Sequence, residues 1–312
     1  MTQLESPIRH AVITPDISVT ELIDQMSGCA FGAGRLADAV DIYTAMLNEH
    51  ECTRFFGLAG AMVPAGMRNI ISHLIREGHI DVLVTTGANM VHDVIEALGL
   101  HHYKGSDLVD DIELKHNQVN RIYDVFLPEE HFTDLEDFLQ SAYSQLSDQT
   151  ISIRELLTHI GSHLEDKDSI LKSAYDANIP IYCPALQDSI IGLQAFLFKQ
   201  NAKLVVDAFA DMKEFMDICY NATRTGALMV GGGVPKNYIL QSMLITPNDF
   251  DYAIQLTTDR PDPGGLSGAT LEEARSWGKV GERARSMTIY GDATITLPLL
   301  VAATISRIGE MR

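Results

Sequence analysis

Residues 66–89 read GMRNIISHLIREGHIDVLVTTGAN, and this stretch decides the expected fold. The apolar residues between positions 70 and 75 fall on one helical face and Gly78 follows as a stop signal, so residues 66–78 are predicted to form a helix. The run IDVLVTTG (80–87) is short, apolar and β-branched, as in a strand that is buried on both faces. A helix that leads directly into such a strand is typical of a parallel α/β sheet.

The same unit recurs along the chain. Strands are predicted at 52–60, 80–87, 179–186, 203–209, 226–233, 252–259 and 286–293. Helices are predicted at about 66–78, 90–99, 130–144, 151–164, 168–177, 188–200, 210–222, 235–244, 269–278 and 296–309. The pattern predicts an α/β fold with a doubly wound, mostly parallel sheet in a single domain over residues 31–312, preceded by an N-terminal arm over residues 1–30.

Composition limits the classes of function. The formal net charge of −19 argues against a nucleic-acid partner, because phosphate binding needs clustered Lys and Arg. We expect no apolar run to reach the length needed to span a bilayer, and the N-terminus lacks a signal-peptide pattern, so we expect a cytoplasmic protein without a membrane partner. We expect the widely spaced cysteines to be buried free thiols, and no metal site is predicted. These cysteines are Cys29, Cys52, Cys183 and Cys219.

Ligands of a doubly wound sheet bind at the carboxyl ends of its strands. The segments at those ends are rich in Gly, Thr and Asp, and they read LAGAMVPAG, TTGANM, PALQDS, VGGGVPKN, TTDRPDPGG and IYGDA. Glycines let the backbone approach a ligand, and free N–H groups at helix starts favour phosphate, so these loops indicate a dinucleotide or a similar ligand. The segment GAGRLA (32–37) lacks a preceding strand and is interpreted as a glycine-assisted helix start rather than a dinucleotide fingerprint.

The segment SWGKV contains the only tryptophan, Trp277, and a lysine, Lys279. A lysine that reacts as a nucleophile must be neutral, and apolar neighbours favour the neutral amine, which can then form an imine. Glu273 lies four residues before Trp277, so a carboxylate and an indole on one helical face would together hold an alkylammonium. From these residues alone, the more economical interpretation is that Trp277 belongs to the core and that the Lys279 side chain reaches solvent.

Longer stretches carry a resemblance to a known family. The segments LSGATLEEARSWGKV, IYGDATITLPLLVA, FGAGRLADAV (31–40), GMRNIISHLIREGHIDVLVTTGAN, IPIYCPALQDS and MVGGGVPKN resemble the deoxyhypusine synthase family, which includes homospermidine synthases, over nearly the whole chain. The resemblance implies a Rossmann-like fold, NAD as cofactor and a homotetramer with sites at subunit interfaces. In this family a hydride passes from spermidine to NAD, 1,3-diaminopropane leaves, and the aminobutyl group moves through an imine on a lysine to an acceptor amine.

The resemblance also implies roles for individual residues. Lys279 matches the imine-forming lysine of the family. The matches to the amine pocket are Glu273, Trp277, Ser267 and Asn237. The matches to NAD contacts are Thr85, Thr86, Gly87, Asp188, Gly231, Gly232, Gly233, Thr258 and Asp292.

Several positions depart from the family pattern. Leu266 and Leu193 stand where the family has substrate aspartates, Asn237 replaces a pocket histidine, and Val91–His92 replaces an acidic pair. An ammonium beside leucine lacks its partner, at a cost on the order of kcal/mol. We therefore expect a substrate other than spermidine, or anchors supplied from elsewhere.

Three functions stay open at this point. The first is an NAD-dependent aminoalkyl transferase acting on a polyamine or related amine, with either a protein lysine or, as in homospermidine synthase, a small diamine as acceptor. The second is an NAD-binding protein without transferase activity. The third is an amine dehydrogenase, which would accumulate NADH.

Overall fold

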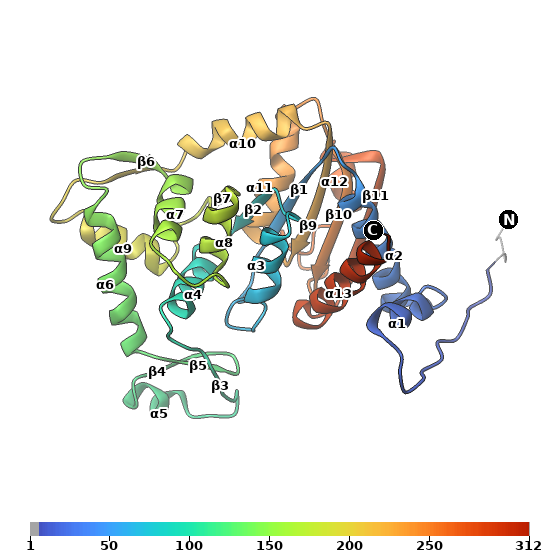
Figure 1. Cartoon of the computed structure of the whole chain (residues 1–312), viewed down its shortest axis with the longest axis horizontal. Coiled ribbons are helices and arrows are strands. Elements are labelled where there is room, and N and C mark those ends of the chain that lie inside the picture. Colours follow the sequence, from blue (N-terminus) through green and yellow to red (C-terminus); the bar gives the residue numbers. More distant parts are fainter. Residues whose placement is uncertain (1–5, 312) are drawn as a thin grey trace.

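Six parallel strands form the central sheet, in the order β11-β10-β9-β1-β2-β7 (Figure 1). The computed structural model describes residues 6–311. The bounds of the strands are β1 (Cys52–Leu58), β2 (Val82–Thr85), β7 (Ile181–Tyr182), β9 (Arg224–Val230), β10 (Phe250–Thr257) and β11 (Val280–Tyr290). Counted along the chain within this sheet, the strands run 3-2-1-4-5-6, which is the order of the Rossmann fold, and the order reverses between β1 and β9. The predicted doubly wound α/β class is confirmed.

Alternate residues of each strand face two separate apolar layers. Phe56 of β1 packs in the core formed with α2 (Phe31–Asn48), α3 (Arg68–Arg76), α4 (Gly87–Ala97) and α13 (Ala293–Met311). Its neighbour Phe55 packs in the other core, with α10 (Ala210–Asn221), α11 (Gly233–Ser242) and α12 (Leu271–Ser276). Burial on both faces is why these strands read as nearly continuous apolar runs. The start of α2 at Phe31 confirms GAGRLA as part of a helix start.

The 203–209 segment does not join the central sheet as its place in the alternation suggested. Its strand β8 (Val205–Asp207) instead pairs in parallel with β6 (Thr150–Ser152) in a two-stranded sheet. Both Val205 and Asp207 are exposed, so β8 lacks the two buried faces of a central strand. The surrounding helices are α6 (Glu130–Ser144), α7 (Ile153–Ser162), α8 (Ile170–Ala177) and α9 (Ile190–Phe198).

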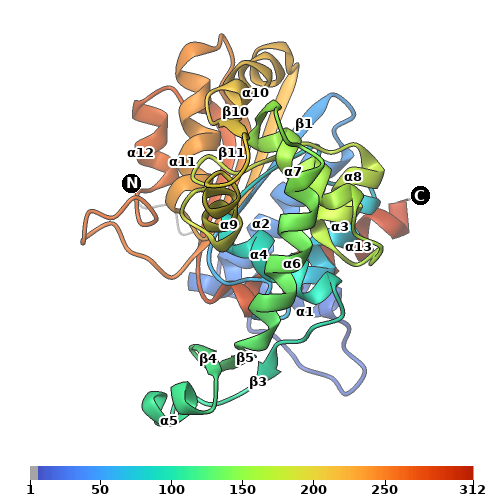
Figure 2. The same cartoon turned by 90° about the vertical axis from the view of Figure 1, so that its left-hand side faces the viewer.

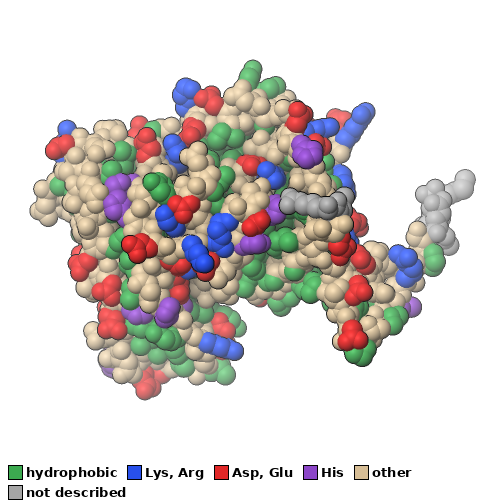
Figure 3. Space-filling view, viewed as in Figure 1, with side chains coloured by type: hydrophobic (Ala, Val, Ile, Leu, Met, Phe, Trp, Pro, Cys, Tyr) green, Lys and Arg blue, Asp and Glu red, His purple; other side chains and the backbone are tan. Residues whose placement is uncertain are grey.

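A small antiparallel sheet projects from one end of the molecule (Figures 1 and 2). It contains β3 (Tyr103–Lys104), β4 (Val119–Ile122) and β5 (Val125–Pro128), with α5 (Asp111–His116) beside it. Apolar side chains gather on this projection in Figure 3, and Leu108, Ile112 and Tyr123 are exposed there.

The C-terminal helix packs against the N-terminal arm. Arg307 of α13 pairs with Asp24 of α1 (Val19–Met26) and with Asp41 of α2, at 2.5 Å each. By length and composition α13 is apolar enough to cross a membrane, so the expectation that no run reaches that length is wrong. That property is weak evidence of a membrane span, because a core helix meets the same criterion.

The four cysteines are free. Cys52, Cys183 and Cys219 are buried as expected, whereas Cys29 is only half-buried because it lies in the loop between α1 and α2. Among residues 6–311, no cluster of His, Cys, Asp or Glu has an arrangement that suits a metal ion.

Candidate active site

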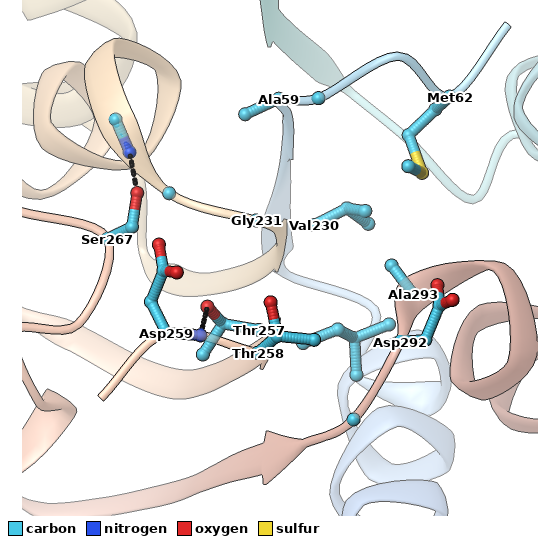
Figure 4. A pocket seen from close by; sticks show the side chains of 15 residues that line it. Ala59, Met62, Val230, Gly231, Thr257, Thr258, Asp259, Ser267, Asp292 and Ala293 are labelled. Atoms are coloured by element: carbon cyan, nitrogen blue, oxygen red, sulfur yellow. Dashed lines mark hydrogen bonds between the residues drawn. The ribbon is translucent and has the colours of Figure 1, made fainter. Parts of the chain in front are cut away.

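A pocket of about 310 Å³ opens at the carboxyl ends of β1, β9, β10 and β11, where the strand order reverses. Figure 4 shows its lining side chains arriving from these four strand ends. The lining residues are Ala59, Gly60, Met62, Val230, Gly231, Gly232, Gly233, Leu256, Thr257, Thr258, Asp259, Ser267, Gly291, Asp292 and Ala293. This is the place where doubly wound sheets bind dinucleotides.

The three consecutive glycines give the pocket its shape. Gly231 and Gly233 have φ angles of 73° and 59°, which L side chains rarely adopt. A Cβ at Gly232 would collide with the backbone of Ser267. The glycines therefore let α11 begin directly at the pocket, with the positive end of its dipole at that edge.

Five of the nine predicted cofactor residues line this pocket, namely Gly231, Gly232, Gly233, Thr258 and Asp292. Asp292 is exposed at the start of α13, where its carboxylate accepts hydrogen bonds from the Thr294 N–H and hydroxyl at 2.8 and 2.9 Å. Ser267, expected in the amine pocket, lies in the wall of the strand-end pocket, and its hydroxyl accepts the Gly233 N–H at 3.0 Å.

The other four predicted cofactor residues form a separate group at the ends of β2 and β7. Thr85 is buried and donates its hydroxyl hydrogen bond to the Leu58 carbonyl at 3.1 Å, while Thr86 caps α4. A Cβ at Gly87 would meet the Ser189 side chain, so Gly87 lies against the segment that contains Asp188. None of these four residues lines the strand-end pocket, and their contact with a cofactor stays a prediction.

A second cavity, of about 190 Å³, brings together most of the predicted amine-pocket residues. Its lining includes Asn237 of α11, Glu273 of α12, and Trp277 and Lys279 in the turn between α12 and β11. The remaining lining residues are Lys236, Leu240, Leu266, Ala269, Thr270 and Ala274. The predicted pairing of Lys279 with Trp277 and Glu273 is thus present as a spatial arrangement.

Backbone hydrogen bonds hold Lys279 on both sides. Helix α12 ends in a Schellman motif, in which the Gly278 N–H donates to the Arg275 carbonyl at 2.9 Å and the Lys279 N–H donates to the Ala274 carbonyl at 3.0 Å. The Lys279 carbonyl then accepts the Phe250 N–H at 3.1 Å, where β10 begins. Open space surrounds the Cβ position of Gly278, so what requires glycine there is its φ of 67°.

Trp277 is a cavity wall and not a core residue. Its side chain is 60% exposed, so the economical interpretation of a core tryptophan is wrong. The Lys279 Nζ lies 5.4 Å from the centroid of the indole ring, within the range of a cation–π contact. Lys279 is half-buried, which is less enclosure than its apolar sequence neighbours suggested.

Sequence reasoning missed a second lysine in this cavity. Lys236 is 3% exposed, and its Nζ donates to the Gln255 side-chain oxygen at 2.9 Å, to the Leu266 carbonyl at 3.4 Å and to the Ala269 carbonyl. Burial lowers the pKa of Lys236 to about 8; the charge of Glu273 opposes this shift and the charge of Lys279 adds to it. Only its place directly after the glycines, in GGGVPK, hinted that it lies near a site.

The departures from the family pattern fall in different surroundings. Leu266 and Asn237 line the amine cavity, whereas Leu193 lies on α9, is 49% exposed and does not line it. Val91 is a core residue, and His92 shares a hydrogen bond of 2.9 Å with His102. Burial lowers the pKa of His92 to about 4, so His92 is neutral near pH 7. Position 92 therefore supplies no charge in place of the family's carboxylate.

The fold and the two cavities define a class of protein: a Rossmann-like α/β protein with a dinucleotide-type pocket and, beside it, a lysine-bearing cavity suited to an amine. A family model described as deoxyhypusine synthase matches residues 21–304. The chain belongs to the deoxyhypusine synthase family. It is accordingly a transferase of aminobutyl groups, from a family that uses NAD.

Relatives of this chain carry the same description. It is 66% identical over 307 residues to a probable deoxyhypusine synthase 1 of Methanosarcina acetivorans, covering 98% of this chain and 97% of the relative. It is 46% identical to a probable deoxyhypusine synthase 1 of Archaeoglobus fulgidus, covering 94% and 96% of the two chains. A crystal structure from Entamoeba histolytica, provisionally assigned as a deoxyhypusine synthase, has a TM-score of 0.68 at 20% identity and covers 96% and 97%, which shows the shared fold.

Proposed function

We propose that this chain is an NAD-dependent aminobutyl transferase that carries the aminobutyl group as an imine on Lys279 and takes it from a polyamine such as spermidine. The observation that carries the proposal is the position of Lys279, Trp277 and Glu273 in one cavity. The turn at residues 266–269 separates this cavity from the strand-end pocket, because Leu266 and Ala269 line the cavity and Ser267 lines the pocket. An amine in the cavity and a cofactor in the strand-end pocket would therefore lie next to each other at this turn.

The strand-end pocket suits NAD in shape and chemistry. When bound, NAD supplies the acceptor and later the donor of a hydride. The Gly231–Gly233 segment at the start of α11 would lie against its phosphates, because the helix dipole favours anions there and glycines let the backbone come close, although the Gly231 and Gly233 N–H groups already donate to the Leu256 carbonyl and the Ser267 hydroxyl. Thr258 and Asp292 offer polar groups at the opposite side of the pocket, and Met62 and Val230 offer apolar surface.

Lys279 performs the covalent step of the proposed reaction. Its free amine attacks the oxidised carbon of the donor, the bond from that carbon to the departing diamine breaks, and the diamine leaves with the proton. The aminobutyl group remains on Nζ as an imine until an acceptor amine displaces Lys279 by the same exchange. Trp277 and Glu273 would hold the charged end of the chain through cation–π attraction and charge pairing.

A specific observation favours a small amine as acceptor as a second candidate. Glu273 is the one carboxylate that lines the cavity within residues 6–311, and Leu266 stands beside it. The volume of about 190 Å³ lies below that of pockets for drug-sized ligands and suits a short linear amine. Transfer to a diamine such as putrescine, in place of a protein lysine, is therefore the alternative to deoxyhypusine formation.

Trapping with borohydride tests the role of Lys279. The wild-type chain, incubated with NAD and spermidine and then reduced, is expected to gain an aminobutyl adduct that peptide mass spectrometry locates at residue 279. Lys279→Ala is expected to lose both the adduct and the transfer product. Lys213→Ala is the matched control, because Lys213 is an exposed lysine on α10, and it should retain both. An adduct that persists in Lys279→Ala would show that another residue carries the group.

Offering putrescine and a protein acceptor separately decides between the two candidates. Stoichiometric accumulation of NADH would point to an amine dehydrogenase, and the absence of any amine product would indicate NAD binding alone. The cytoplasmic location stays a prediction from the sequence pattern, and the homotetramer stays a prediction from the resemblance.

A further inference from the structure

Lys236 is a buried cation without a carboxylate partner. Among the ion pairs of residues 6–311, none includes Lys236, although its side chain is almost fully buried. Burying an ammonium is costly unless hydrogen bonds replace its water. A methionine of similar length would fill the space without that cost. The lysine is therefore explained better by what its N–H groups hold than by packing.

Each of the three N–H donors of Lys236 has an acceptor of its own. These acceptors are the Gln255 side-chain oxygen at 2.9 Å, the Leu266 carbonyl at 3.4 Å and the Ala269 carbonyl. Because an ammonium has three donors and no acceptor, this set is saturated. Two of the three acceptors lie on the 266–269 turn, so Lys236 ties that turn to α11.

Gln255 extends the same network into the strand-end pocket. It is 1% exposed on β10, and its amide nitrogen donates to the Gly231 carbonyl at 3.0 Å and to the Ser267 carbonyl at 2.8 Å. The Gly233 N–H in turn donates to the Ser267 hydroxyl at 3.0 Å. One continuous chain of hydrogen bonds thus links α11, β10, the glycine loop and the 266–269 turn.

The position of that turn sets the separation of the two cavities. Ser267 faces the strand-end pocket, while Leu266 and Ala269 line the amine cavity. Hydride transfer needs the cofactor and the amine carbon in near contact, so the position of this turn limits how closely a cofactor in one cavity can approach an amine in the other. Hydride transfer is sensitive to geometry, since a displacement of about 1 Å can cost about 10²-fold in rate.

We propose that Lys236 and Gln255 are positioning residues that clamp the 266–269 turn and so fix the distance between the cofactor and the amine. The effect of the clamp on the reaction rate rests on the proposed function. Its effect on the mobility of the turn does not depend on catalysis. Neither residue is expected to contact the reacting atoms. The clamp acts through the backbone of the turn.

Kinetics of Lys236→Met, Gln255→Met and the double variant test the clamp, with Lys213→Met as the control on an exposed lysine. Each single variant is expected to lower kcat about 10²-fold while the KM for the amine changes less than about threefold. The double variant is expected to lose no more than either single one, because the two residues act as one unit. A donor deuterated at the reacting carbon should show a larger isotope effect on kcat in the variants than in the wild-type enzyme.

Amide hydrogen exchange supplies a readout that needs no activity. The amides of Gly233, Gly268 and Ala269 should exchange faster in both single variants, and those of α10 should not change. Unchanged exchange with kcat within threefold of the wild type would overturn the clamp, as would multiplicative losses in the double variant. If Lys236→Met fails to fold, Gln255→Met decides alone. A wild-type chain without transfer activity would defeat the proposed function and leave the exchange test standing.

Discussion

At the residue scale, Gly278 determines where Lys279, the proposed imine-forming lysine, lies. Its φ of 67° ends α12 and turns the chain into β11, so that the Lys279 backbone is held by Ala274 on one side and by Phe250 on the other. An L side chain in the left-handed region costs roughly 1–2 kcal/mol. The placement of Lys279 therefore depends on a backbone conformation that only glycine adopts freely.

Replacing Gly278 with alanine should expose this dependence. Gly278→Ala is expected to lower the free energy of unfolding by about 1–2 kcal/mol, measured by urea denaturation, and to reduce trapping at Lys279. Gly309→Ala on α13 is the control, because its Cβ would also meet open space and its φ is not positive. That variant should be neutral or more stable by up to about 1 kcal/mol. Equal losses in both variants would contradict the assignment to φ.

At the scale of elements, Asp93 joins three helices beneath the strand ends. This fully buried residue of α4 accepts hydrogen bonds from the Arg68 side chain of α3 at 2.7 Å and from the Ser169 hydroxyl at 2.8 Å. It also accepts the Ile170 and Leu171 N–H groups at 2.9 Å each, which caps α8. Every lone pair in this arrangement meets a donor, so the carboxylate charge is compensated despite its burial.

Removal of that charge should destabilise the packing of these helices. Asp93→Asn is expected to lower the free energy of unfolding by about 3–5 kcal/mol, because it leaves Arg68 without a buried partner and points amide hydrogens at donors. Thermal and urea denaturation measure the loss. Asp176→Asn, which removes an exposed carboxylate paired with Lys172 at 2.7 Å, is the control and should change stability by less than about 1 kcal/mol. A similar small effect at position 93 would refute the structural role.

At the scale of the whole molecule, apolar side chains remain exposed on one face of α9 and in the loop before α10. Leu193, Phe196 and Leu197 are 49, 58 and 42% exposed, and Phe209 is 77% exposed. The first three follow helical spacing, so they lie on one face of α9. Exposed apolar patches mark interaction surfaces, and the family resemblance predicts a homotetramer. We predict that this face makes contacts between copies of the chain.

A charge on α9 is expected to disrupt that assembly. Light scattering should give the wild-type chain a mass that is a multiple of 34.3 kDa, and Phe196→Glu should lower it. Phe31→Glu is the control, because Phe31 is 91% exposed at the start of α2, away from this face, and its mass should not change. A wild-type mass of one chain would defeat the assignment.

Local patterns predicted most of the fold and part of the site. Strands such as 80–87 were recognisable because burial on both faces leaves a continuous apolar run, and Gly231–Gly233 marked a ligand loop because few other residues tolerate those conformations. Lys236 and Gln255 escaped prediction, because a polar residue inside an apolar helix or strand does not show in sequence which distant carbonyls will satisfy it.

The sequence by itself determined the alternation of strands and helices, the family, and the place of Trp277 two residues before Lys279. Each of these is written in residues close together in the chain, where periodicity and spacing are set by local backbone geometry. Only the tertiary structure decided the strand order, the exclusion of β8 from the central sheet and the shared wall between the two cavities. These features depend on contacts between residues far apart in the chain. The free energy of such contacts is gained only when the whole fold forms, so no single segment of sequence encodes them.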